Sequence, residues 1–111
     1  MKSIKRSVAV EKMPRVVSAM QGKVFLRELQ RHINAGRPLI VLDCSNLYKL
    51  DDCIVYVLLC CLEEAMKCNG DVKLAALPSD VVSAPYIARL NRIFDIYNTT
   101  SDAVSSFPNS K

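Results

Sequence analysis

The chain has no tryptophan, three glycines and a single histidine among its 111 residues. The motifs G-x-x-x-x-G-K-[ST], G-x-G-x-x-G, H-E-x-x-H and G-x-S-x-G, which serve phosphate binding, dinucleotide binding, zinc binding and nucleophilic catalysis, are all absent. The histidine, His32, has no serine or cysteine partner near it in sequence, so we assign it no catalytic role. These absences argue against an enzyme.

Long apolar runs are missing as well. The longest, Cys53 to Leu62, is far shorter than the roughly 20 residues that a membrane-spanning helix needs. The basic N-terminus also lacks the apolar stretch and cleavage site of a secretory signal. We therefore expect a cytoplasmic protein without a membrane span.

The five cysteines follow neither a metal-binding nor a disulfide pattern. A zinc site favours C-x-x-C pairs or Cys/His clusters, whereas these cysteines are odd in number and irregularly spaced. We expect reduced thiols, no disulfide, no metal and no cofactor. The residues concerned are Cys44, Cys53, Cys60, Cys61 and Cys68.

Positive charge is concentrated at the beginning of the chain. Residues 1–37 hold nine Lys/Arg and two acids, whereas residues 38–111 hold six Lys/Arg and nine acids. Nucleic-acid surfaces of this kind usually interleave a set of aromatic residues that stack on bases, and these scattered basic residues have no such set among them. We expect no direct nucleic-acid binding and favour either a solvated face or an acidic protein partner.

The length and the high share of hydrophobic residues, half of the total, predict one domain over residues 1–111 with a frayed tail at 108–111. Strands and helices alternate, which predicts an α/β fold with a largely parallel sheet. The run 38–44 is apolar without alternation, as in a central strand covered on both faces. The other strands are expected at 4–13, near a sheet edge, at 71–77 and at 93–97.

Four helices are expected between and after these strands. Ser18 and Gln21 form a capping-box pattern for the first helix, which carries an apolar stripe of Phe25, Leu26, Leu29 and Ile33 and ends at Gly36. The second follows Asp51 and Asp52 and runs through Cys68. The third starts at Pro78 and Ser79 and is interrupted or delayed by Pro85, and the last covers 100–107 with Thr100 or Ser101 as its cap.

The second helix has two distinct sides. Placing residues 100° apart assigns Ile54, Val55, Leu58, Leu62, Ala65 and Met66 to the core. The opposite side carries an i,i+4 pair of Glu63 and Lys67, together with Tyr56 and Cys60. A contiguous exposed apolar patch often marks an interface. We expect Tyr56 and Cys60, with Ile54 near the helix start, to join a protein contact, with a homodimer as one form of it.

Three carboxylates stand near the second helix, with Asp43 at the end of a strand and Asp51 and Asp52 at the helix start. Such acids can bind Mg²⁺ when they converge at one sheet edge. The alternative, which we favour because no phosphate-binding loop accompanies them, is that Asp51 or Asp52 caps the helix.

The order of elements and several strings resemble the STAS domain, the family of anti-sigma factor antagonists: IVLDCSNLYKLDD, LLCCLEEAMKCNGDVKLAAL, LNRIFDIY and SDAV. The resemblance covers about 4–107 and is weakest over 1–17. The family's signature turn reads Asp-Ser-[Ser/Ala]-Gly-[Leu/Ile]-Gly. The corresponding place here reads D-D-C-I-V-Y.

The resemblance implies a STAS-like fold, with a small mixed or largely parallel sheet and helices mainly on one face. It matches Asp43 to the acidic residue that ends the strand, Asp51 to the first signature residue and Asp52 to the serine that partner kinases phosphorylate. Ile54 and Tyr56 replace the two glycines. The site it implies for partner binding is Asp43, Asp51, Asp52, Cys53, Ile54, Tyr56 and Cys60.

Three functions are compared on this basis. The leading hypothesis is a bacterial regulatory module that binds an anti-sigma factor with a serine-kinase fold, without the phosphorylation switch because Asp52 is not a serine. The second is an accessory subunit of a membrane transporter, since STAS-like domains also occur beside transport proteins. The third, and weakest, is a small enzyme that uses Asp43, Asp51 and Asp52 with Mg²⁺.

Overall fold

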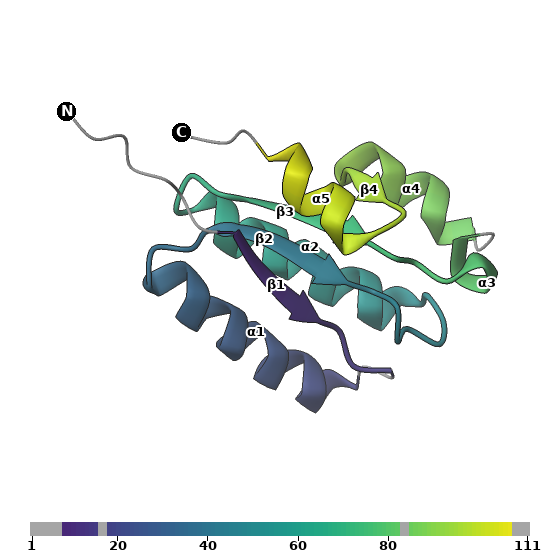
Figure 1. Ribbon diagram of the computed structural model, residues 1–111. Helices are drawn as coiled ribbons and strands as arrows, with labels where there is room; N and C mark the ends of the chain where they lie inside the picture. Colours follow the sequence, from purple (N-terminus) through teal and green to yellow (C-terminus); the bar gives the residue numbers. More distant parts are fainter. Residues whose placement is uncertain (1–7, 16–17, 83–84, 108–111) are drawn as a thin grey trace.

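The computed structural model describes residues 8–15, 18–82 and 85–107 (Figure 1). Four parallel strands form one sheet in the order β1-β2-β3-β4. The strands are β1 (Val8–Lys12), β2 (Leu39–Asp43), β3 (Asp71–Ala75) and β4 (Ile96–Tyr97). The helices are α1 (Ala19–Asn34), α2 (Asp52–Met66), α3 (Ser79–Val82), α4 (Pro85–Ile93) and α5 (Thr100–Ser106).

The parallel α/β architecture predicted from the sequence is confirmed. β2 lies inside the sheet and β1 lies at its edge, as expected. The last strand is shorter than predicted because Ile93 belongs to α4. Residues 4–7, part of the first predicted strand, and the predicted tail 108–111 lie outside the described residues.

The two faces of the sheet are covered unequally (Figure 1). Side chains of α1, α2 and α4 pack with Ile40 and Leu42 in the larger core cluster. On the opposite face, α5 contributes Ala103, and Phe107 follows it, to a small cluster around Val41. The implied arrangement of helices mainly on one face is therefore confirmed.

The ends of α1 match the sequence pattern. Ser18 Oγ accepts a hydrogen bond of 3.2 Å from the Gln21 backbone N–H, and Gln21 Oε1 accepts one of 3.0 Å from the Ser18 N–H. Gly36 follows the helix with a φ of 88°, a left-handed conformation that favours glycine. This capping box fixes where α1 begins, and with it the side chains that face α2.

The course of α2 agrees with the prediction at its start and differs at its end. Asp51 is the N-cap, and the helix ends at Met66 rather than at Cys68. Asn69 turns the chain with a φ of 61°. Gly70 then passes so close to β2 that an added Cβ would overlap the carbonyl oxygen of Pro38. This close approach lets the chain enter β3 beside β2.

A buried lysine ties α5 to the sheet. Lys73 Nζ donates a hydrogen bond of 2.8 Å to Ser106 Oγ and lies 4.4 Å from the centroid of the Phe107 ring.

The cap of α5 is Thr99, whose Oγ1 accepts from the Asp102 N–H at 3.0 Å, so the prediction of Thr100 or Ser101 is wrong. All three residues have a capping hydroxyl, and the sequence alone does not separate them.

Candidate functional site

The candidate site is built around the loop between β2 and α2 and the first turns of α2. Asp43 ends β2, and its Oδ1 accepts a hydrogen bond of 3.0 Å from the Ser45 backbone N–H. The Asp43 carbonyl also accepts a bond of 2.9 Å from the Met13 N–H. Asp43 therefore shapes the turn that leaves the sheet.

Asp51 caps α2 through its side chain. Its Oδ1 accepts a hydrogen bond of 3.0 Å from the Ile54 N–H, and its Oδ2 lies 3.5 Å from Lys49 Nζ. The capping role that the sequence favoured for one of the two aspartates is confirmed for Asp51. The neighbouring Asp52 is left with its carboxylate pointing outward from the first turn, where it is exposed.

Asp52 is bound by a residue of α4. The Tyr86 hydroxyl donates a hydrogen bond of 2.7 Å to Asp52 Oδ1. This bond raises the pKa of Tyr86 above its ordinary value, because the protonated phenol is the form that donates. The Arg89 guanidinium lies 5.8 Å from the centroid of the same ring. Tyr86 was not predicted from the sequence, since nothing near it in the chain indicates a partner at the start of α2.

The three aspartates are thus engaged by different donors rather than gathered around one point. Asp43 binds the Ser45 N–H, Asp51 binds the Ile54 N–H and Asp52 binds Tyr86. Within the ranges that the structure describes, no three His, Cys, Asp or Glu side chains are placed to hold a metal ion. The arrangement supports capping and surface recognition, and it does not support magnesium chemistry.

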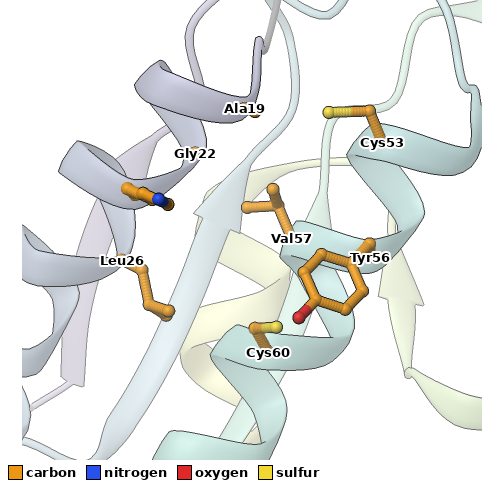
Figure 2. A pocket seen from close by; sticks show the side chains of 8 residues that line it. Ala19, Gly22, Leu26, Cys53, Tyr56, Val57 and Cys60 are labelled. Carbon is orange, nitrogen blue, oxygen red and sulfur yellow. The ribbon is translucent and has the colours of Figure 1, made fainter.

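The residues that stand at the glycine positions of the signature point in opposite directions. Ile54 is 1% exposed and packs in the core, so the expectation that it adds to the exposed patch is wrong. Tyr56 is 68% exposed, while Cys60 is half-buried. A hydrogen bond to Cys60 raises the pKa of the Tyr56 hydroxyl, and Figure 2 shows the hydroxyl directed toward that sulfur.

The outer face of α2 is more apolar than the sequence indicated. Leu59, one turn from Tyr56, is exposed, and so is Met66 at the end of the helix, which was predicted to lie in the core. The predicted ion pair of Glu63 with Lys67 is also wrong, because Lys67 Nζ bonds Glu64 Oε2 at 3.0 Å. We call the following residues the outer face of α2: Tyr56, Leu59, Cys60, Glu63 and Met66.

The sequence profile of the STAS domain matches residues 16–103. This chain belongs to the STAS domain family. No curated protein matches it in sequence. Among solved structures, a candidate anti-sigma factor antagonist from Thermotoga maritima has a TM-score of 0.67 at 20% identity, covering 87% of this chain and 79% of that one.

Two further structures share the STAS fold. The NMR structure of the same Thermotoga protein has a TM-score of 0.76 at 19% identity, over 96% of this chain and 88% of that one. An anti-sigma-factor antagonist (STAS) domain protein from Planctomyces limnophilus has a TM-score of 0.70 at 11% identity, over 87% of each chain. At these identities the likeness establishes the fold. Among the described helices of this STAS domain, none is long and apolar enough to span a membrane.

One hollow of this STAS domain lies beside the candidate site. It has a volume of about 250 Å³ and separates the first turns of α1 from those of α2 (Figure 2). We call it the α1–α2 hollow. Its lining consists of Ala19, Gly22, Lys23 and Leu26 from α1, and Cys53, Tyr56, Val57 and Cys60 from α2. Cys53 and Cys60, named from the sequence, thus share this hollow with Tyr56.

Proposed function

We propose that this STAS domain is a non-catalytic, cytoplasmic regulatory module that binds a protein partner, in the manner of anti-sigma factor antagonists, and that it has lost control by serine phosphorylation. The partner we propose is an anti-sigma factor with a serine-kinase fold. The observation that carries the proposal is the exposed carboxylate of Asp52 in the first turn of α2. By resemblance, the phosphorylated serine of the family stands at that position.

A carboxylate at this position changes what a kinase can do. A serine kinase transfers the phosphoryl group to a hydroxyl oxygen, and Asp52 has none. Its charge of −1 is smaller than the −1.5 to −2 of a phosphoserine, and a phosphatase cannot remove it. The hydrogen bond from Tyr86 holds the carboxylate in one place. The surface therefore has a fixed charge where the family has a reversible one.

The outer face of α2 supports the binding role. Tyr56 and Met66 are 68% and 60% exposed, and Leu59 adds a third apolar side chain to the same face. Aromatic and methionine side chains are enriched in protein interfaces, whereas charged residues are depleted at their centres. A partner that covers this face would remove the exposed apolar surface from water. The same argument applies to a homodimer through this face.

The phosphorylation part of the proposal is tested with a kinase-type anti-sigma factor and ATP. Wild type, Asp52→Ser and Asp52→Ser/Tyr56→Gly are incubated with the kinase, and phosphate is located by mass spectrometry. We expect no modification of wild type within 51–56, and modification of the double variant. Ile54 is left unchanged because it is buried and does not crowd the surface. Stoichiometric phosphate on wild type within 51–56 would overturn the proposal.

The binding part is tested with the same kinase-fold protein by measuring its affinity. We expect Tyr56→Lys and Cys60→Arg to weaken binding, because each places a charge on the outer face of α2. Val10→Lys is the control, since Val10 is 47% exposed but belongs to a strand at the edge of the sheet. Unchanged affinity and unchanged self-association in both α2 variants would remove the support for this surface.

A further inference from the structure

The α1–α2 hollow is lined almost entirely by carbon and sulfur. Ala19 and Gly22, one turn apart on α1, contribute little or no side chain, and so leave space opposite Val57 (Figure 2). Gly22 lies inside α1, where a glycine lowers helix stability by about 1 kcal/mol relative to alanine. The volume of about 250 Å³ exceeds the roughly 150 Å³ of an apolar cavity that accepts benzene. One large apolar side chain fits this space.

Positive charge stands on one rim of the hollow. Lys23 lines it, and Arg27 lies one turn further along the same side of α1. Both are exposed, and within the described part of the chain neither takes part in an ion pair. The next cation of the helix, Arg31, does have a partner, at 3.7 Å in Glu28. The rim therefore presents two cations to an approaching molecule.

The opposite rim joins the outer face of α2. Tyr56 and Cys60 belong both to the hollow and to that face. A molecule seated in the hollow would consequently meet the exposed apolar side chains of α2 as well. An extended surface of this kind, with one apolar hollow and a charged edge, matches a polypeptide better than a compact metabolite.

We propose that the α1–α2 hollow is the docking site for a segment of the partner protein that inserts one large apolar side chain and places carboxylates against Lys23 and Arg27. This inference rests on the proposed function and specifies the chemistry of the partner. Burial of the apolar side chain supplies affinity, because apolar area leaves water. The two cations select an acidic segment and set its direction along α1.

The test uses synthetic peptides as probes of the isotope-labelled full chain. The first is an acetylated nine-residue peptide with a central Phe flanked by Glu on both sides. The second has Ala in place of Phe, and the third has Lys in place of every Glu. We expect the first peptide to shift the backbone NMR signals of 19–27 and 53–60. Loss of the Phe side chain should weaken binding by about 10- to 100-fold.

Surface variants decide whether the hollow and its rim are responsible. Ala19→Trp fills the hollow from an exposed position, and we expect it to weaken binding of the Phe peptide by about 10-fold or more. Lys23→Glu/Arg27→Glu should reduce it by roughly 5-fold or more. Arg37→Glu, past the far end of α1, is the matched control and should bind as wild type does.

Several results would overturn the inference. They are the absence of shifts at millimolar peptide, equal binding of the Glu and Lys peptides, or wild-type binding by both the Ala19 and the Lys23/Arg27 variants. One further measurement separates a failure of this inference from a failure of the proposed function. A kinase-fold partner that binds wild type and Ala19→Trp equally would refute docking in the hollow while leaving the binding role in place.

Discussion

The Tyr86 hydroxyl donates a hydrogen bond of 2.7 Å to Asp52 Oδ1, although the two residues are 34 positions apart in the chain. The bond joins α4 to the first turn of α2. The candidate site is therefore made by two helices, and a partner that contacts Asp52 also meets Tyr86. The bond occupies Oδ1 of the carboxylate, and the second oxygen can still accept from a donor of a partner.

This bond predicts how Tyr86 titrates. The pKa of Tyr86 is raised above its ordinary value of 10.0, chiefly by the hydrogen bond to Asp52. Since the folded state favours the protonated phenol, the bond stabilises the fold below pH 10 and is lost as pH rises through the raised pKa. NMR titration of labelled tyrosine should show the pKa fall toward 10 in Asp52→Asn. Asp102→Asn, in α5, is the control, and an unchanged pKa in Asp52→Asn would contradict the assignment.

Burial predicts an order of reactivity for the thiols. Burial raises the pKa of Cys44 to about 12 and that of Cys61 to about 12, whereas Cys68 is exposed. At pH 8 only about one in 10⁴ of the buried thiols is ionised, and the thiolate is the reactive form. An aromatic disulfide reagent should modify Cys68 first, and Cys44 and Cys61 only after urea unfolding. Cys68→Ser should remove the first phase, and prompt labelling of Cys44 in folded protein would contradict the prediction.

Substitution of two glycines by alanine should reduce the free energy of unfolding by different amounts. Gly70→Ala places a Cβ on the carbonyl oxygen of Pro38, so the backbone must move, and we expect a loss of about 2 to 3 kcal/mol. At Gly36 a Cβ meets no atom within 4 Å, and only the φ of 88° opposes it, which corresponds to about 1 kcal/mol. Urea unfolding measures both. Equal losses would show that the contact with Pro38 does not restrict position 70.

The small cluster under α5 should depend on Phe107. This side chain is 6% exposed, packs on the sheet face with Ala103 and stands over the Lys73 ammonium. We expect Phe107→Ala to reduce the free energy of unfolding by about 3 kcal/mol. Ser105→Ala, at an exposed position of the same helix, should change it by less than about 0.5 kcal/mol. Similar values for the two variants would show that α5 contributes little to the fold.

Local chemistry explains what could be predicted from the sequence. The side chains of Ser18 and Gln21 each accept a hydrogen bond from the other residue's backbone N–H, within four residues of sequence. The uninterrupted apolar run of β2 requires that both faces of the strand be covered. Met66 was wrongly assigned to the core because its angle around α2 gives the direction of the side chain, and does not show whether a neighbouring element covers that part of the helix. The ion pair was misassigned because Glu63 and Glu64 both come within reach of Lys67, and only Glu64 also accepts from Gln30 Nε2, at 3.2 Å.

The candidate site was predictable in part. The capping aspartate and the exposure of Tyr56 follow from positions on one helix. The bond from Tyr86 depends on how α4 packs, and the α1–α2 hollow depends on the missing side chains of Ala19 and Gly22 facing a second helix. Both features depend on contacts between segments that are far apart in the chain, and the residue pattern within one segment does not predict such contacts.

The parallel order of the strands also determines how this chain can fold. Val8 pairs with Leu39, and Leu39 with Asp71, so the paired positions lie roughly 30 residues apart in each case. The entropy of closing such long loops is lost before the strand contacts compensate for it, which slows folding relative to a helical bundle of equal length. The rate-limiting step should then require α1 and α2 to bring the strands together, and changes that weaken these helices would prolong the time during which apolar strands remain open to other chains.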